Sequence, residues 1–519
     1  MKTSPATDLP ALAMRRTQRA SPGVLFAVYA PFGTDPVLSR FPGDQARSIR
    51  RQPLVKALMQ VAHQGVNVAA LIDLHDDDSW LVEIPAGRPA QASFASAWKQ
   101  AMHRPQALAG FLRRAHGRFP CGALVLALEG HGAGYLPEVD GLLITPERTT
   151  NGGATSWRID GDGASPALPP FSGSPELPVD SPEGLPVTLP LSTWGLAEAL
   201  RSARRAGVTR PAVIHFNNCF NMAVEHLHTV APHAEFATGY GNYNFFTAGA
   251  AYPQVFRRLR QAGSATAEQL AQWFAAENAA GLRAKGNHPT VGATVRLSRM
   301  KVIGAAVDAL GTALTKALQA DRPAALPRIQ DAIRRARHYD TEGDYGLAVP
   351  DQTTDLGSLA AQLQAAYPSG PVHAAATATE AALKGVWQYG DFDRPYMKET
   401  EIWDFRDPRL GMSILLPDPG RQGRWDWRSP YYLAGKADPS APPAHRHQIP
   451  FLTDRPQRPP WVQFIVEYHR DVPFVGLLRA KPLQFPVFDA RFKPKYPPPT
   501  DKRPPDDGKA GRNDPEQLR

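Results

Sequence analysis

Short apolar runs alternate with amphipathic helical segments along the first half of this chain. Residues 24–29 and 66–72 each have the length and composition of a buried strand. Between them, apolar residues at 54, 55, 58 and 59 recur with the spacing of one helix face. A strand, a helix and a second strand at this spacing predict a βαβ unit, whose strands run parallel because the helix carries the chain back. The alternation therefore predicts a mainly parallel sheet covered by helices.

Composition limits the protein class to large globular proteins. Of the 519 residues, 43% are hydrophobic and 21% are charged, which is typical of a chain that buries a sizeable core. The longest apolar runs are strand-sized, so no transmembrane helix and no membrane partner are expected. We find no continuous apolar segment near the start, and Cys121 and Cys219 are the only cysteines. Both observations favour a reducing, cytoplasmic location.

The net charge of +9 raises the question of nucleic-acid binding. Arginine pairs occur at several places, and the tail from 491 to 519 is basic and rich in proline. They are not accompanied by an RNP-type aromatic pattern, zinc-ligand spacing or a glycine-rich phosphate loop. We interpret the basic clusters as solvated surface, so nucleic acid is not an expected partner. One open alternative is that the basic tail docks nucleic acid or an acidic protein.

Residues 212–225 place a cysteine at the end of a predicted strand. The apolar run 212–216 is followed by two asparagines, and apolar residues at 220, 223, 224 and 227 then have helical spacing. Cys219 is therefore predicted at the carboxyl end of a strand, where open α/β folds bind their ligands. We also expect it to lie against a helix N-terminus, whose partial positive charge favours a thiolate.

A histidine follows another predicted strand. The apolar run 122–128 leads into the sequence Glu-Gly-His-Gly-Ala-Gly, which contains His131. If the two strands are parallel neighbours, His131 and Cys219 meet at the same edge of the sheet. A thiolate, an imidazole and backbone N–H donors from Gly132 and Cys219 would then supply the nucleophile, the proton carrier and the oxyanion site of a cysteine peptidase.

Simpler interpretations exist for both residues. A cysteine after a strand is often a small buried apolar residue, and a histidine between glycines can belong to an ordinary turn. Other histidines also compete for a role. His215 lies within the strand and is interpreted as a core residue, whereas His226 and His228 are predicted to face solvent on the following helix.

Several segments resemble the clostripain-type cysteine peptidases of the caspase-like superfamily. The resemblance implies a caspase-like α/β/α sandwich around a mainly parallel sheet, with a helical and mixed C-terminal extension. It also implies a His131–Cys219 dyad and a peptide or protein substrate. The matching pieces, in order, are the strand with His131-Gly132-Ala133-Gly134-Tyr135, the helix at 191–206, the strand ending in Asn217-Asn218-Cys219 with Glu225 six residues on, and the weaker matches Asp355-Leu356-Gly357-Ser358-Leu359, 410–417 and 461–465.

One departure from that family concerns the specificity pocket. Its members commonly carry an aspartate two residues before the cysteine, placed to meet a basic P1 side chain, and this chain has Asn217 there. An amide offers no full charge to a cation, so we expect a neutral or polar P1 residue. We expect Asn217, Asn218 and the 239–246 loop, with Tyr240 and Asn242, to line the pocket.

The resemblance also implies self-cleavage between the histidine and cysteine strands, and a possible dependence on calcium. The segment 146–190 contains Arg148 and Arg158 as candidate cleavage points. An acidic cluster at 73–78 offers hard carboxylate ligands for calcium, with Asp76 and Asp78 as the candidates. It lacks the spacing and glycine of an EF-hand loop, so a solvated turn is the favoured interpretation. No other cofactor is expected.

The second candidate function is a caspase-fold binding or regulatory protein with little or no catalytic activity. Intact Cys219 and His131 argue against it, whereas Asn217, in place of the family's usual aspartate, leaves room for it.

Composition shifts predict how the chain is divided. The predicted units are an irregular leader at 1–22, a peptidase domain at 23–297 with a proline-rich insertion at 161–190, a C-terminal α+β region at 298–480, and a basic, proline-rich tail at 481–519 expected to be disordered.

Overall fold

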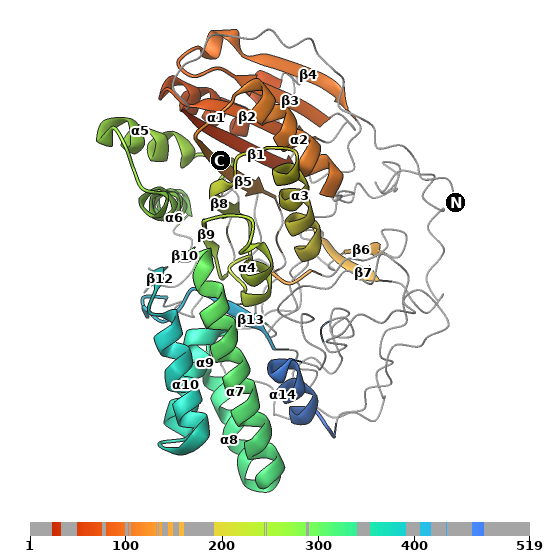
Figure 1. The fold of residues 1–519 in the computed structure, drawn as a ribbon, viewed down its shortest axis with the longest axis vertical. Coiled ribbons are helices and arrows are strands. Elements are labelled where there is room, and N and C mark those ends of the chain that lie inside the picture. The colour runs from red at the N-terminus through yellow and green to blue at the C-terminus, as the bar shows by residue number, and fades with distance from the viewer. Residues whose placement is uncertain are drawn as a thin grey trace.

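Figure 1 shows the fold in a computed structural model of the chain. The parts of the chain that the structure describes are residues 23–32, 49–74, 79–98, 102, 105–130, 132, 134–136, 144–148, 155–159, 191–242, 244, 247–286, 290–339, 353–390, 405–416, 432 and 459–471. The predicted leader, the proline-rich insertion and the C-terminal tail lie outside these residues. Among the described helices, none combines the length and the hydropathy that crossing a membrane requires.

A nine-stranded sheet forms the centre of the molecule. Its five central strands are parallel, and antiparallel strands extend both edges. The order is β12 (Val386–Gly390), β10 (Val291–Arg296), β9 (Phe236–Tyr240), β8 (Pro211–Asn217), β5 (Ala123–Glu129), β1 (Val24–Pro31), β2 (Asn67–Asp73), β3 (Ser79–Ile84) and β4 (Ser93–Trp98). The prediction of a mainly parallel sheet is confirmed.

Helices cover both faces of this sheet. One layer contains α1 (Pro53–His63), α5 (Tyr252–Ala262) and α6 (Ala267–Gly286), and the other contains α2 (Pro105–Arg118), α3 (Thr193–Arg205) and α4 (Val224–Val230). Strand β1 shows how the sequence produces two cores. Phe26 and Val28 pack with the first layer, while Leu25 and Ala27 pack with the second, because neighbouring side chains of a strand point to opposite faces. The expected α/β/α sandwich is therefore observed.

A helical region extends from one end of the sandwich (Figure 1). Its α-helices are α7 (Met300–Ala320), α8 (Arg322–Arg335), α9 (Leu356–Ala366), α10 (Gly370–Leu383) and α14 (Pro460–Tyr468). Two short strands, β11 (Thr353–Asp355) and β13 (Ser413–Leu415), pair antiparallel beside it. This agrees with the expected mixed extension. The boundaries of the predicted units stay a prediction, and β12 shows that residues after 297 also contribute to the main sheet.

The remaining described elements are short. β6 (Ile144–Arg148) and β7 (Thr155–Ile159) form an antiparallel pair of their own. Single turns of 3₁₀ helix occur at Ile49–Arg51, Pro89–Gln91 and Leu297–Arg299. The apolar pattern missed β4, β6, β7, β11 and β12, because short strands carry little periodicity. It also predicted a strand over 410–416, of which only the three residues of β13 pair.

Candidate active site

Cys219 stands at the carboxyl edge of the central sheet, two residues beyond the end of β8. Strand β8 pairs parallel with β5, and Asn217 is the register partner of Glu129. The strands that precede His131 and Cys219 are thus neighbours that end at the same edge, as the sequence predicts. The cysteine is half-buried and forms no disulfide. His131 lies outside the described residues, so its side chain is not placed.

The expected helix N-terminus behind Cys219 is absent from this part of the structure. Helix α4 begins only at Val224, and the preceding Ala223 has extended backbone angles. Neighbouring segments hold the backbone instead. The N–H of Met222 donates to the Tyr240 carbonyl at 3.1 Å, and the Met222 carbonyl accepts the N–H of Ser413 at 2.9 Å. The prediction that a helix dipole activates the thiol is therefore wrong, because this effect fades beyond the first turn of a helix.

A backbone amide from another loop approaches the sulfur instead. The N–H of Asn244 donates to Cys219 Sγ at 3.3 Å, and the Asn244 carbonyl oxygen lies 3.6 Å from the same sulfur. A hydrogen bond donated to sulfur favours the charged thiolate. Sequence reasoning placed the 239–246 loop in the site but selected other residues of it, since the sequence does not show which loop amide faces the cysteine.

Two glycines that follow position 131 pack closely against residues 219 and 220. A Cβ built at Gly132 would lie 2.1 Å from the Cys219 carbonyl oxygen and 2.9 Å from its nitrogen. At Gly134, where φ is +62°, a Cβ would lie 3.2 Å from the Phe220 carbonyl oxygen. Only glycine tolerates the approach at 132 without a shift of backbone. Gly132 is therefore packed against Cys219, and Gly134 against Phe220, the next residue of the same turn.

A buried polar network connects the ends of β5 and β8. Asn217 Nδ2 donates to both carboxylate oxygens of Glu129 at 3.0 Å, and the Tyr252 hydroxyl donates to the same carboxylate. Asn217 Oδ1 accepts from Asn244 Nδ2 at 2.8 Å, and Asn278 Nδ2 donates to Asn244 Oδ1 at 2.9 Å. Through these bonds, the same network holds the strand end before Cys219 and the loop whose N–H reaches its sulfur.

Glu129 is the most perturbed acid of this edge. Its side chain is 1% exposed, and burial raises its pKa to about 7, although the bonds from Tyr252 and Asn217 act in the opposite direction. Sequence reasoning missed Glu129. Its position as the last residue of a strand, two before His131, was the available signal, but an isolated glutamate at a strand end is usually solvated.

The other residues expected in the pocket have internal partners. The Tyr240 hydroxyl accepts from Asn278 Nδ2 at 2.7 Å, and Asn242 Oδ1 accepts the N–H of Val291 at 3.0 Å. Asn218 Oδ1 accepts from Asn221 Nδ2 at 2.6 Å. Tyr240 and Asn242 are fully buried. Their contact with a substrate stays a prediction, and the structure gives them a clear role in holding the loop.

Two of the competing histidines belong to the packed interior. His215 is fully buried and stacks on Phe274 with ring centroids 4.7 Å apart, and burial lowers its pKa to about 3. Its interpretation as a core residue is confirmed. His226 was expected to face solvent, and this is wrong. It is buried edge-to-face against Phe216, with its pKa lowered to about 4, because α4 packs against α3 and α7. His228 is half-buried.

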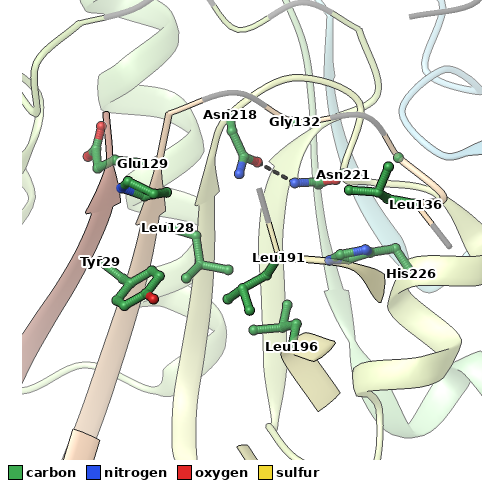
Figure 2. A pocket seen from close by; sticks show the side chains of 12 residues that line it. Tyr29, Leu128, Glu129, Gly132, Leu136, Leu191, Leu196, Asn218, Asn221 and His226 are labelled. Atoms are coloured by element: carbon green, nitrogen blue, oxygen red, sulfur yellow. Dashed lines mark hydrogen bonds between the residues drawn. The ribbon is translucent and has the colours of Figure 1, made fainter. Parts of the chain in front are cut away.

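A small pocket lies beside the turn that carries Cys219 (Figure 2). Its volume is about 30 Å³, and Gly132, Asn218 and Asn221 line it together with Leu128 and His226. A space of this size is large enough for a water molecule. The figure shows the Asn218–Asn221 hydrogen bond at the edge of this pocket, close to Gly132. The described residues therefore leave a small, partly polar space next to the turn that carries Cys219.

Calcium binding stays a prediction. In the described ranges, no three His, Cys, Asp or Glu side chains gather in a way that could hold a metal ion. Asp73 is buried at the end of β2, and its Oδ1 accepts the hydroxyl of Ser79 at 3.0 Å. The candidates Asp76 and Asp78 lie outside the described residues.

No protein-family model matches the chain, and no curated protein sequence does. Solved structures do match. Three of them are C11 cysteine proteases.

Three of these structures illustrate the likeness. A secreted C11 protease from Bacteroides thetaiotaomicron, solved with an irreversible peptide inhibitor, is 14% identical, with a TM-score of 0.46 over 76% of this chain and 92% of its own. A secreted C11 protease from the same species, called iotapain, is 10% identical, with a TM-score of 0.49 over 76% of this chain and 94% of its own. An inactive zymogen of a C11 protease from Parabacteroides distasonis is 11% identical, with a TM-score of 0.46 over 77% of this chain and 94% of its own. At these identities and TM-scores, the function of this chain has to be argued from its own residues.

Gly132→Ala should disrupt the site, because its Cβ would overlap the Cys219 backbone. We expect the alkylation rate of Cys219 by iodoacetamide, and any peptidase activity, to fall at least about tenfold. Gly281→Ala on α6 is the matched control, since no atom lies within 4 Å of its added Cβ. Mass spectrometry of alkylated peptides gives the rates. Equal rates in the two variants would contradict this packing.

Glu129 should make stability depend on pH. Its folded-state pKa of about 7 lies above the ordinary 4.5, so its contribution is fully present below pH 4.5 and is lost as pH rises through 7. The free energy of unfolding of the wild type, relative to Glu129→Gln, should fall by roughly 3 kcal/mol across this window.

Urea unfolding of both proteins at several pH values measures this difference. The comparison isolates Glu129, because the lowered pKa values of His215 and His226 act in the opposite direction in both proteins. A difference that does not change with pH would show that Glu129 ionises normally.

Proposed function

We propose that the chain is a cysteine endopeptidase in which Cys219 is the nucleophile and His131 is its proton carrier. The observation that carries the proposal is the close packing of Gly132 on the backbone of Cys219 at the ends of two parallel strands. This contact holds Gly132, the neighbour of His131 in the sequence, against the backbone of a half-buried cysteine. The Asn244 N–H at 3.3 Å from the sulfur supports the thiolate that such chemistry needs.

The proposed reaction proceeds through a thioester acyl-enzyme. The thiolate of Cys219 attacks the scissile carbonyl carbon, and the N–H groups of Gly132 and Cys219 donate to the resulting oxyanion. His131, protonated, gives its proton to the leaving amine as the C–N bond breaks. A water molecule then attacks the thioester while His131 accepts one of its protons, and the carboxylic acid leaves as the thiolate reforms.

The proposed P1 preference is a neutral or polar side chain. Asn217 carries no charge, its amide hydrogens are directed to Glu129, and its oxygen accepts from Asn244. The carboxylate of Glu129 is 1% exposed and already accepts from Asn217 and Tyr252, so it is not available to a substrate cation. Asn218, Tyr240 and Asn242 complete the proposed pocket through the loops that they hold in place.

Self-cleavage in the 146–190 segment remains part of the proposal. Arg148 ends β6 and Arg158 lies in β7, where it is the register partner of Thr145. A protease accepts a substrate as an extended, unpaired chain, so cleavage at either arginine would require this hairpin to open. The neutral P1 preference also argues against both points, and mass analysis of the expressed protein would locate a cut if one occurs.

We further propose a cytoplasmic location for the enzyme, with a peptide or protein as substrate. Both cysteines are free in the structure, as a reducing compartment requires. Two of the similar solved proteases are described as secreted, and this description applies to them. Fractionation of the native host cell would decide between the two locations.

A non-catalytic binding or regulatory protein is the second candidate function. It is favoured by the enclosed surroundings of Asn217, since a pocket closed by its own hydrogen bonds does not admit a P1 side chain. In that case Cys219 would be a packed thiol without special reactivity. Its alkylation rate near neutral pH would then resemble that of the buried Cys121.

A peptide-library cleavage profile tests the proposed function directly. The full chain should cleave peptides, with and without added calcium, and Cys219→Ala should abolish cleavage because no other thiol lies at the sheet edge. The profile also gives the P1 residue. Strict cleavage after arginine or lysine would contradict the proposed pocket. No cleavage under any condition, with Cys219 slow to alkylate, would favour the binding protein.

Asn217→Asp should destabilise the protein, although aspartate is usual at this position in the family that the sequence resembles. The new carboxylate would face Glu129 at hydrogen-bond distance in a buried site. We expect a loss of about 3 kcal/mol in unfolding free energy, measured by urea titration at pH 8. In the double variant Glu129→Gln, Asn217→Asp, an amide at 129 faces a carboxylate at 217, so the donor–acceptor pair is restored in reverse. This variant should recover most of the loss. A stable single variant would contradict this account.

A further inference from the structure

The residue after the nucleophile has an unfavourable backbone conformation. Phe220 has φ of 60°, in the left-handed region that a bulky side chain rarely occupies. Its N–H donates to the Asn242 carbonyl at 3.0 Å. Its ring belongs to a buried apolar cluster against which Cys219 packs. The other members of this cluster are Val291, Tyr339, Phe405 and Leu410. Most of the cluster therefore comes from residues far along the chain.

Tyr339 of this cluster is also hydrogen-bonded to Asp355 and Gly411. The Tyr339 hydroxyl donates to Asp355 Oδ2 at 2.7 Å. The N–H of Gly411 donates to the same oxygen at 2.8 Å and lies 2.9 Å from the Tyr339 hydroxyl oxygen. Asp355 Oδ1 accepts the N–H of Ser358 at 2.7 Å, which caps α9. We refer to Tyr339, Asp355 and Gly411 as the C-terminal clasp. Asp355 is fully buried, and its carboxylate accepts from Tyr339, Gly411 and Ser358.

The clasp contacts the loops that surround the nucleophile. A Cβ at Gly241 would lie 2.9 Å from Tyr339 Cε2 and 3.3 Å from the Gly411 carbonyl oxygen. The clasp is therefore in close contact with the segment after β9 that contains Gly241, Asn242 and Asn244, which we call the 240s loop. Two residues beyond Gly411, Ser413 donates its N–H to the Met222 carbonyl. The nucleophile turn, residues 219–222, is thus held at Phe220 by the cluster and at Met222 by the segment that carries Gly411.

We propose that the C-terminal clasp positions Cys219 by holding the left-handed Phe220 turn in place. Tyr339, Asp355 and Gly411 are positioning residues in this account, because they act through Phe220 and the 240s loop and do not touch the sulfur. The inference rests on the proposed function for its catalytic meaning. It assigns a role to the segments around Asp355 and Gly411, which the dyad alone leaves unexplained.

Tyr339→Phe in the full chain tests the proposal. The substitution keeps the ring in the cluster and removes only the hydroxyl that joins Asp355 to Gly411. We expect alkylation of Cys219 by iodoacetamide at pH 7 to slow roughly tenfold, because the sulfur moves relative to the Asn244 N–H. For the peptidase, kcat should fall by a similar factor while KM stays within about twofold.

Tyr367→Phe is the matched control. Tyr367 lies at the end of α9 in the same part of the chain, is half-buried, and donates its hydroxyl to the Ala325 carbonyl at 3.4 Å. This variant should alkylate and cleave at the wild-type rate. Thermal unfolding of both variants separates positioning from general stability, since a merely structural role would lower the midpoint without the change in kcat.

A second variant covers the case in which Tyr339→Phe does not fold. Phe220→Gly keeps the clasp bonds and permits a positive φ but removes the side chain from the cluster, so it should also slow alkylation. An alkylation rate equal to or above that of the wild type, in whichever of the two variants folds, overturns the proposal. Normal alkylation of wild-type Cys219 without any peptide cleavage would instead contradict only the proposed function.

Discussion

The bond between Asn217 and Glu129 joins the two strand ends on which the candidate site depends. Parallel pairing of β5 with β8 brings both ends to one edge, and the side-chain bond then fixes their separation at the last residue of each strand. The carboxyl group is buried, which raises its pKa to about 7, and the bonds from Asn217 and Tyr252 offset only part of the cost of its charge. The same asparagine accepts from Asn244, so the loop that reaches the sulfur follows the strand ends. Stability and site geometry are therefore coupled at this point.

Backbone contacts, rather than a helix dipole, define the surroundings of Cys219. The turn that carries it is extended at Ala223, left-handed at Phe220 and hydrogen-bonded to the 240s loop. Gly132 lies against the Cys219 backbone, and any side chain at position 132 would collide with it. A site built in this way depends on the position of several loops at once. It follows that residues of the C-terminal half can influence the sulfur without touching it.

Much of the fold could be predicted from the amino-acid pattern. Strands such as β1, β2, β5 and β8 are continuous apolar runs, because both of their faces are covered by helices. The amphipathic helices that cover them show one apolar face each. Short elements such as β12 and β13 were missed or misplaced, since they have too few residues to show a period. The burial of His226 was missed for another reason: α4 packs against both α3 and α7, which the helical pattern of α4 alone does not show.

The sequence by itself determined the order of strands and helices, and with it the two strand ends that precede His131 and Cys219. Local periodicity encodes this information, because each element buries its own apolar face. Only the tertiary structure decided that Glu129 meets Asn217, that Asn244 approaches the sulfur and that Tyr339, Asp355 and Gly411 support the turn at Phe220. The Cys219–Asn244 and Glu129–Asn217 contacts join residues 25 and 88 positions apart in the chain. No local pattern records such pairings, because they arise only when the packed layers bring the loops together.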